Sequence, residues 1–221
     1  YRLAKYNISP NALQTYFTKH RFEVCINTAA YTDVDAAEKD KDAAFAINAT
    51  AVETLAKVCK QHGCWLLHIS TDYVFDGTLD RAYAPSDTPN PLNVYGASKL
   101  AGEQAIHAVS GTYSIVRTSW LYSQYGNNFY TRLQAQLDAG KTLRVTADQH
   151  GCPTRAEDLA AHLLTGIANQ QLPKGISHYC GNEIMTWLDL ARRLFPKQKV
   201  LKWVGENSPT TRPKKVVLKK L

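Results

Sequence analysis

Apolar and polar positions alternate along the first half of the chain in two recurring patterns. Short apolar runs rich in β-branched residues predict strands over 22–28, 64–70 and 113–118. Between them, apolar residues recur every three or four positions and predict helices over 11–20, 42–62 and 93–108. Strands separated by helices of this length form parallel βαβ units. The pattern therefore predicts an α/β fold with a doubly wound, Rossmann-like parallel sheet.

The second half of the chain has a looser pattern. It predicts helices over 128–138, 155–169 and 186–195, and strands over 142–146, 176–180 and 199–204. The chain contains no internal repeat and no low-complexity stretch.

Composition narrows the class of protein. A 44% hydrophobic and 20% charged composition is that of an ordinary soluble domain, and no apolar run approaches the roughly 20 residues of a membrane span. The five cysteines form no Cys-x-x-Cys pair, which favours a reducing cytoplasm and argues against a metal site built from cysteines. We expect no membrane and no nucleic-acid partner, because four of the basic residues behind the +7 charge crowd the last eight positions without a nucleic-acid motif.

The candidate chemistry lies in Tyr95 and Lys99, four residues apart on a predicted helix and therefore on one face. A phenol titrates near pH ~10, and a neighbouring cation favours the phenolate. Thr71, at the carboxyl end of a predicted strand, could hold a carbonyl oxygen against that phenol. The three residues predict a proton-transfer site for carbonyl reduction, with an exposed helical pair as the alternative. Tyr1 and Lys5 repeat the spacing by chance, since nothing around them supports it.

Longer motifs carry a family resemblance. Ser-Thr-Asp-Tyr-Val-Phe-Asp-Gly at 70–77 and Asn-Val-Tyr-Gly-Ala-Ser-Lys at 93–99 are flanked by similar strings at 26–38, 117–122, 126–129, 148–154 and 212–213. In this order they resemble the dTDP-4-dehydrorhamnose reductases of the extended short-chain dehydrogenase/reductase superfamily. The resemblance covers nearly the whole chain.

The resemblance implies an enzyme. It would reduce the C4 ketone of dTDP-4-dehydro-L-rhamnose with NADPH or NADH, giving dTDP-L-rhamnose for surface polysaccharide, in the cytoplasm and with a homodimer allowed. Thr71, Tyr95 and Lys99 would be catalytic. A catalytically silent, dinucleotide-binding regulatory subunit of the same superfamily is the alternative, and a nucleotide-sugar epimerase is a weaker one.

Further site residues follow from the same resemblance. The cofactor would lie against Tyr95, Lys99, Asn48 and the run Thr28, Ala29, Ala30, Tyr31 and Thr32. The nucleotide sugar would meet Asp72, Tyr73, Trp120, Asn128 and Arg212. Each has a plainer alternative, such as turn stabilisation for Asp72, core packing for Trp120 and a basic tail for Arg212. We assign no metal ligand, although Glu157 resembles a position associated with a divalent cation such as Mg²⁺ in some members.

One departure from the superfamily concerns its Gly-rich turn at a helix N-terminus. None of the twelve glycines makes Gly-x-Gly-x-x-Gly. We therefore expect the N-terminal strand and Gly-rich loop to be missing from these residues, as part of a longer protein. By resemblance, 1–122 and 154–171 would form the dinucleotide-binding domain. Residues 123–153 and 172–221 would form a smaller α/β lobe over the substrate.

Overall fold

A four-stranded parallel sheet organises the chain. The computed structural model describes residues 10–203 and 208–220, so the Tyr1/Lys5 pair lies outside the described residues. The strands are β1 (Val24–Asn27), β2 (Trp65–Thr71), β3 (Tyr113–Thr118) and β8 (Gly175–His178), in that spatial order. All three pairings are parallel, so the carboxyl ends of the strands lie along one edge.

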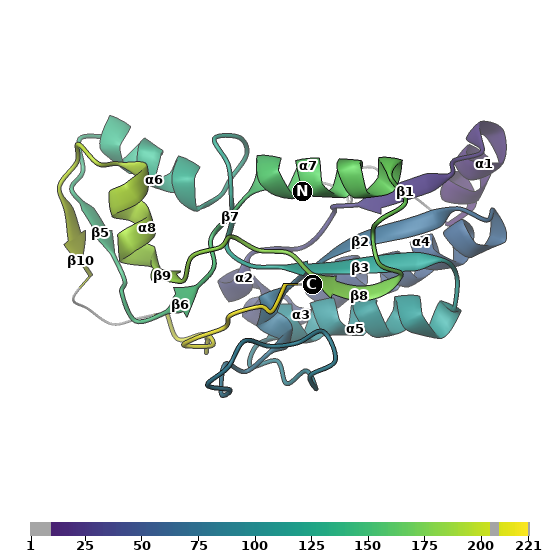
Figure 1. The fold of residues 1–221 in the computed structure, drawn as a ribbon, viewed down its shortest axis with the longest axis horizontal. Coiled ribbons are helices and arrows are strands. Elements are labelled where there is room, and N and C mark those ends of the chain that lie inside the picture. The colour runs from purple at the N-terminus through teal and green to yellow at the C-terminus, as the bar shows by residue number, and fades with distance from the viewer. Residues whose placement is uncertain (1–9, 204–207, 221) are drawn as a thin grey trace.

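Helices cover both faces of this sheet (Figure 1). On one face, α4 (Ala51–Gln61) and α5 (Val94–Val109) pack on Leu66 and Ile115, with Phe17 of α1 (Pro10–His20) joining them. On the other, α7 (Ala156–Ala168) packs on Leu67 and Val116. Successive strand residues point to opposite faces, so adjacent apolar residues feed different cores. The predicted fold class, a doubly wound parallel sheet, is confirmed.

The predicted helix over 42–62 is interrupted. It consists of α3 (Lys41–Phe45), a π-helical turn η2 (Ala46–Thr50) and α4. The π turn contains Asn48, which is fully buried and hydrogen-bonded to groups outside its own helix. A π turn adds one residue per turn and commonly marks a functional position. Ahead of it, α2 (Val34–Lys39) begins at Asp33, whose carboxylate accepts from the Ala36 N–H at 2.9 Å; this helix was not predicted.

A smaller lobe lies beyond the carboxyl edge of the sheet (Figure 1). It contains α6 (Phe129–Asp138), α8 (Trp187–Leu194) and the parallel strands β5 (Leu143–Val145) and β10 (Val200–Lys202). Its own core includes Leu133, Leu143, Leu188 and Phe195. Two short pairs connect the parts, β4 (Leu121–Tyr122) with β7 (Thr154–Arg155) and β6 (His150–Gly151) with β9 (Met185–Thr186).

Sequence analysis assigned residues 172–221 to the smaller lobe, but the main sheet includes a strand from this range. Strand β8 pairs with β3 from Ser114 to Arg117 and so belongs to the sheet, not to the lobe. The final described segment also returns, with Val216 and Leu218 packed against Val74 and Phe75 beside the one-turn helix η3 (Asp72–Val74). A short apolar strand does not encode its own partner, so only the tertiary pairing decides this assignment. None of the helices described is both long and apolar enough to cross a membrane.

A buried ion pair joins α5 to the sheet. Arg117 Nη2 of β3 lies 2.7 Å from Glu103 Oε2 of α5, and both side chains are almost completely buried. Ser70 Oγ of β2 donates to Glu103 Oε1 at 2.5 Å, and the Arg117 guanidinium lies over the Phe75 ring. Burying either charge alone costs several kcal/mol, so the pair holds α5 in one position across β2 and β3.

We predict that Glu103→Gln lowers the free energy of unfolding by about 3–5 kcal/mol, because Arg117 is left as an unpaired buried charge. Urea unfolding measures it. Glu183→Gln is the matched control: its pair with Arg193 is also 2.7 Å long but both side chains are more than half exposed, so the loss stays below about 1 kcal/mol. Equal losses in the two variants would contradict the assigned role.

Candidate active site

The predicted catalytic residues, Thr71, Tyr95 and Lys99, lie near the carboxyl edge of the sheet, where α5 begins. Helix α5 starts at Asn93, whose Oδ1 accepts from the Gly96 N–H at 2.8 Å. Gly96 allows the helix to approach the preceding loop closely, since a Cβ there would lie 2.2 Å from the Tyr73 carbonyl oxygen. This contact places Tyr95 beside Thr71 at the end of β2.

Tyr95 and Thr71 form the first contact of the site. The Tyr95 phenol lies next to the Thr71 hydroxyl, close enough for that hydroxyl to act on the Tyr95 pKa. Burial raises the pKa of Tyr95 to about 12; the Thr71 hydroxyl opposes the shift and the Asp72 charge adds to it. We expected a neighbouring cation to lower this pKa, but in this structure burial dominates. The phenol is therefore protonated at neutral pH and able to donate.

Lys99 lies one turn further along α5 and faces β2. Its side chain is 2% exposed, and Nζ donates to the Ile69 carbonyl oxygen at 2.7 Å. Nζ is also 3.1 Å from His68 Nε2. Burial lowers the pKa of Lys99 to about 8, opposed by the charge of Glu103. The amine thus changes charge close to physiological pH.

Asp72 and Tyr73 extend the site beyond the strand. Asp72 is 3% exposed and accepts from Thr71 Oγ1 at 3.2 Å; burial raises its pKa to about 7, against the hydrogen bonds that favour the carboxylate. The Tyr73 ring meets Tyr95 edge-on, with centroids 5.7 Å apart. The Arg212 guanidinium lies near Tyr73, where it opposes the burial that raises the Tyr73 pKa, and it pairs with Asp35 of α2 at 2.8 Å. The structure therefore brings Arg212, 139 positions later in the chain, to the same place.

The expected cofactor loop, residues 28–32, is tied to α5 through Asn48. Asn48 Oδ1 accepts from the Tyr31 N–H at 2.8 Å, and its Nδ2 donates to the Tyr31 carbonyl and to Ser98 Oγ. Ser98 in turn donates to the Tyr95 carbonyl at 2.8 Å. The loop, with only alanines at 29 and 30, therefore lies at a fixed distance from the Tyr95 turn. Thr28 and Thr32 are exposed at its ends.

Two predicted substrate residues have strong local contacts. The Trp120 ring stacks on Trp187 with centroids 3.7 Å apart and lies against Gly151, which places it between the sheet and the lobe. Asn128 begins α6: its Oδ1 accepts from the Tyr130 N–H and its Nδ2 donates to the Tyr125 carbonyl. These contacts explain both residues structurally, and their role toward a substrate stays a prediction.

Sequence reasoning missed several polar residues of the site. His68 is fully buried in β2 and lies between Asn27 and Lys99. Glu103 and Ser98 support Lys99 and Tyr95 from α5. The signal was available in β2, where the α5-facing positions run Leu66, His68, Ser70. Polar residues on a buried strand face indicate partners that only the neighbouring element supplies.

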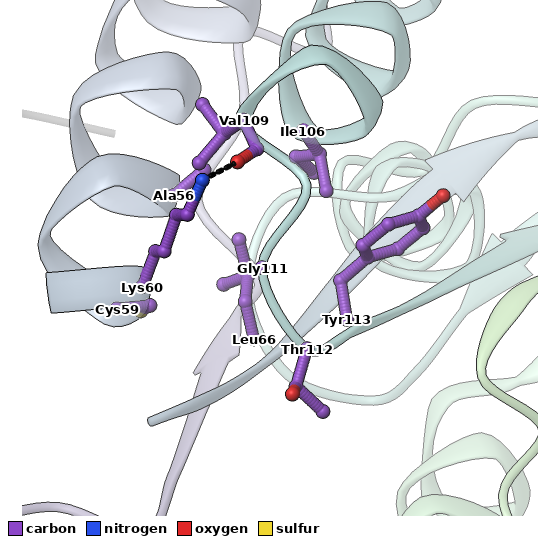
Figure 2. A pocket seen from close by; sticks show the side chains of 9 residues that line it. All are labelled: Ala56, Cys59, Lys60, Leu66, Ile106, Val109, Gly111, Thr112 and Tyr113. Carbon is purple, nitrogen blue, oxygen red and sulfur yellow. Dashed lines mark hydrogen bonds between the residues drawn. The ribbon is translucent and has the colours of Figure 1, made fainter. Parts of the chain in front are cut away.

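A hollow at the opposite end of the sheet does not belong to this site. Figure 2 shows it between α4 and α5, with Lys60 Nζ donating to the Val109 carbonyl across its mouth. Its volume of about 10 Å³ holds no more than one water molecule. In the parts of the chain that the structure describes, no group of three His, Cys, Asp or Glu side chains is arranged to hold a metal ion. Glu157, the residue that resembles a cation-associated position of the family, has other partners: its Oε1 accepts from Ser123 Oγ, and its Oε2 lies 3.9 Å from Arg155 Nε.

Comparisons with known proteins give the family. The model of the RmlD substrate binding domain matches residues 5–219. The chain belongs to this RmlD family. It is 39% identical over 194 residues to a dTDP-4-dehydrorhamnose reductase of Salmonella typhimurium, covering 86% of the chain and 65% of that relative. It is 40% identical over 182 residues to the Escherichia coli K12 protein of the same name, covering 81% of the chain and 61% of that relative.

The solved structures agree. A crystal structure of dTDP-4-dehydrorhamnose reductase from Bacillus anthracis in complex with NADP matches with a TM-score of 0.90 and 35% identity, over 96% of this chain and 77% of that one. The RmlD chain described here spans 61–65% of the length of the two curated relatives above.

We predict that Asp72→Asn changes how stability depends on pH. The folded pKa of Asp72, about 7, is above its ordinary value of 3.8, so the folded state binds this proton more tightly. Its contribution is fully present below pH ~4 and is lost as pH rises to about 7. In thermal unfolding across this range, the midpoint of Asp72→Asn should rise relative to that of the parent protein as pH increases.

Asp76→Asn is the control of opposite sign. Hydrogen bonds from Asn90 and its other neighbours hold the Asp76 pKa well below its usual range, so this variant loses stability at neutral pH and the gap closes in acid. If Asp72→Asn runs parallel to the parent protein from pH 4 to 7, Asp72 does not titrate as assigned.

Proposed function

We propose that this chain is the catalytic part of an NAD(P)H-dependent reductase that converts the C4 ketone of dTDP-4-dehydro-L-rhamnose to the alcohol of dTDP-L-rhamnose. The observation that carries the proposal is the placement of the Tyr95 phenol beside Thr71, one helical turn from the buried Lys99. Membership of the RmlD family and the names of the relatives support the substrate class.

The roles of the residues follow from what a ketone reduction requires. Reduced nicotinamide, when bound, supplies the hydride to the carbonyl carbon. Thr71 holds the carbonyl oxygen, and Tyr95 gives its proton to that oxygen as negative charge develops. Proton donation by a positioned side chain typically contributes 10²–10⁴-fold to rate. The Tyr95 phenol is protonated at neutral pH, which is the form that donates a proton in this direction.

The residues present fit the nicotinamide end of the cofactor. Residues 28–32 offer a loop whose side chains are small at Ala29 and Ala30, and Asn48 holds this loop at the Tyr95 turn. Lys99 would hold the ribose hydroxyls once its ammonium is engaged there. NADPH or NADH would serve; the NADP bound to the Bacillus anthracis relative supports the former.

The nucleotide sugar would lie between the sheet edge and the lobe. Asp72 and Tyr73 border the reacting carbon, and Trp120 offers a ring to the deoxysugar. Arg212 presents a planar, permanently charged guanidinium of the kind that binds diphosphates in a forked geometry. Asn128 would lie near the same diphosphate. We also propose a homodimer in the cytoplasm. The five cysteines, all free thiols, support the reducing compartment.

The test is oxidation of NADPH and NADH with dTDP-4-dehydro-L-rhamnose by the complete natural polypeptide that contains this chain. Tyr95→Phe should lower kcat by roughly 10²-fold or more while the thermal midpoint changes little. Tyr113→Phe is the matched control, since that hydroxyl bonds only His107 at the other end of β3; its turnover should be unchanged.

Two outcomes would overturn the enzyme assignment. Near-normal turnover by Tyr95→Phe removes Tyr95 from its role. Cofactor binding without turnover in the parent protein favours a regulatory subunit of the same superfamily.

A further inference from the structure

His68 occupies the middle of a buried hydrogen-bonded chain that connects the cofactor loop to Lys99. It lies directly opposite Asn27 in the β1–β2 register and is fully buried. Its Nδ1 is 2.9 Å from Asn27 Nδ2, and its Nε2 is 3.1 Å from Lys99 Nζ. Both ring nitrogens therefore have a single protein partner each.

The direction of these hydrogen bonds follows from the far end of the chain. Asn27 Oδ1 accepts from the Ala29 N–H at 3.1 Å, so the Asn27 amide presents its NH₂ group to His68. An NH₂ group can only donate. His68 Nδ1 must accept, and the ring proton is then on Nε2, facing Lys99.

An imidazole N–H facing Lys99 requires a neutral amine. A neutral Lys99 accepts from His68 with its lone pair and donates to the Ile69 carbonyl, so every group is satisfied. An ammonium has three donors and no acceptor, and would meet the Nε2–H as donor against donor. Burial holds the pKa of His68 well below 6.5, so the ring does not respond by taking a second proton at neutral pH.

The charged state of Lys99 demands the other arrangement. His68 must move its proton to Nδ1, so that Nε2 accepts from the ammonium. Nδ1–H then needs an acceptor, which Asn27 provides only by rotating its amide and releasing the Ala29 N–H. Each buried polar group left unpaired costs about 1–3 kcal/mol, so the two arrangements do not mix freely.

We propose that His68 is a positioning residue whose imidazole changes tautomer when Lys99 gains or loses its proton, and that this change frees or engages the Ala29 N–H at the cofactor loop. When Lys99 loses its charge, the Ala29 N–H bonds Asn27 Oδ1; when Lys99 gains its charge, this hydrogen bond is released. Its consequence for catalysis rests on the function proposed above.

Other charged groups near Lys99 set where this event occurs. Glu103 of α5 acts on the Lys99 pKa directly, Arg117 of β3 is paired with Glu103, and Asp72 of η3 acts on the pKa of Tyr95. Glu103 favours the ammonium, but its two oxygens are already bonded to Arg117 and Ser70. The lone pair of His68 Nε2, when available, is the one contact to Lys99 that differs between the two tautomers.

The direct test is the tautomer of His68 in ¹⁵N-histidine protein, read from two-bond ¹H–¹⁵N correlations between about pH 6 and 10. We expect Nε2–H above the Lys99 pKa of about 8 and Nδ1–H below it. The spectra contain their own reference, because His178 is equally buried and its Nδ1 faces the Tyr83 carbonyl, which fixes Nδ1–H throughout. Lys99→Met should abolish the transition and leave Nε2–H.

Kinetics provides a second readout. The alkaline limb of kcat/KM, where Lys99 loses its charge, should move up by roughly one pH unit in His68→Gln, because an amide oxygen accepts from the ammonium without a tautomer change. It should move down in His68→Leu, where that acceptor is lost. His178→Gln, a buried histidine of the same sheet away from Lys99, should leave the limb in place.

The outcomes separate the two proposals. One His68 tautomer at every pH, or a transition that survives in Lys99→Met, overturns the role of His68 whether or not the protein turns over substrate. If the enzyme is active and the alkaline limb of kcat/KM stays in place in both His68→Gln and His68→Leu, His68 is only a packing residue. A parent protein without turnover sinks the reductase assignment, while the spectra still decide the tautomer.

Discussion

The contact between α5 and the sheet is the constraint on which the site depends. Lys99 and Glu103 lie one turn apart on the buried face of α5, and neither is accessible to water. A buried charge costs several kcal/mol unless it is paired, and a buried neutral polar group costs about 1–3 kcal/mol unless it is hydrogen-bonded. The sheet provides the match: Arg117 and Ser70 bond Glu103, and Ile69 and His68 bond Lys99. Helix α5 therefore has one position and one rotation in which these groups are satisfied, and that position sets Tyr95 beside Thr71.

A second constraint acts from the side of the loop. The π turn at Asn48 places a buried amide where it bonds both the Tyr31 backbone and Ser98 of α5. In a regular α-helix each side chain is turned by about 100° from the one before it. Without the extra residue of the π turn, Asn48 would therefore point away from Tyr31 and Ser98, and the connection would be lost. The irregular turn thus keeps the loop at 28–32 in register with the Tyr95 turn, which an i,i+4 pattern alone cannot do.

Burial acts on all the titratable groups of the site in the same sense. It favours the neutral form, so the pKa of Tyr95 and of Asp72 rises while that of Lys99 and of His68 falls. The free protein therefore holds a protonated phenol and groups that change charge near neutrality. A ketone reduction consumes a proton, and a site biased toward protonated phenol is suited to that direction.

The sequence by itself determined the class of fold and the candidate catalytic pair. Its short apolar runs and its period-3.6 patterns identified the four strands of the main sheet and the helices α5 and α7, because hydrophobic patterning is a local property. The spacing of Tyr95 and Lys99, and the position of Thr71 at a strand end, were equally local. The tertiary structure decided the rest. The pairing of β8 with β3, the return of Arg212 to Tyr73, and the partners of His68 and Glu103 join segments far apart in the chain. The tertiary structure also decided the pKa of Tyr95, because a pKa depends on which groups surround a residue after folding. No spacing in the sequence contains that information.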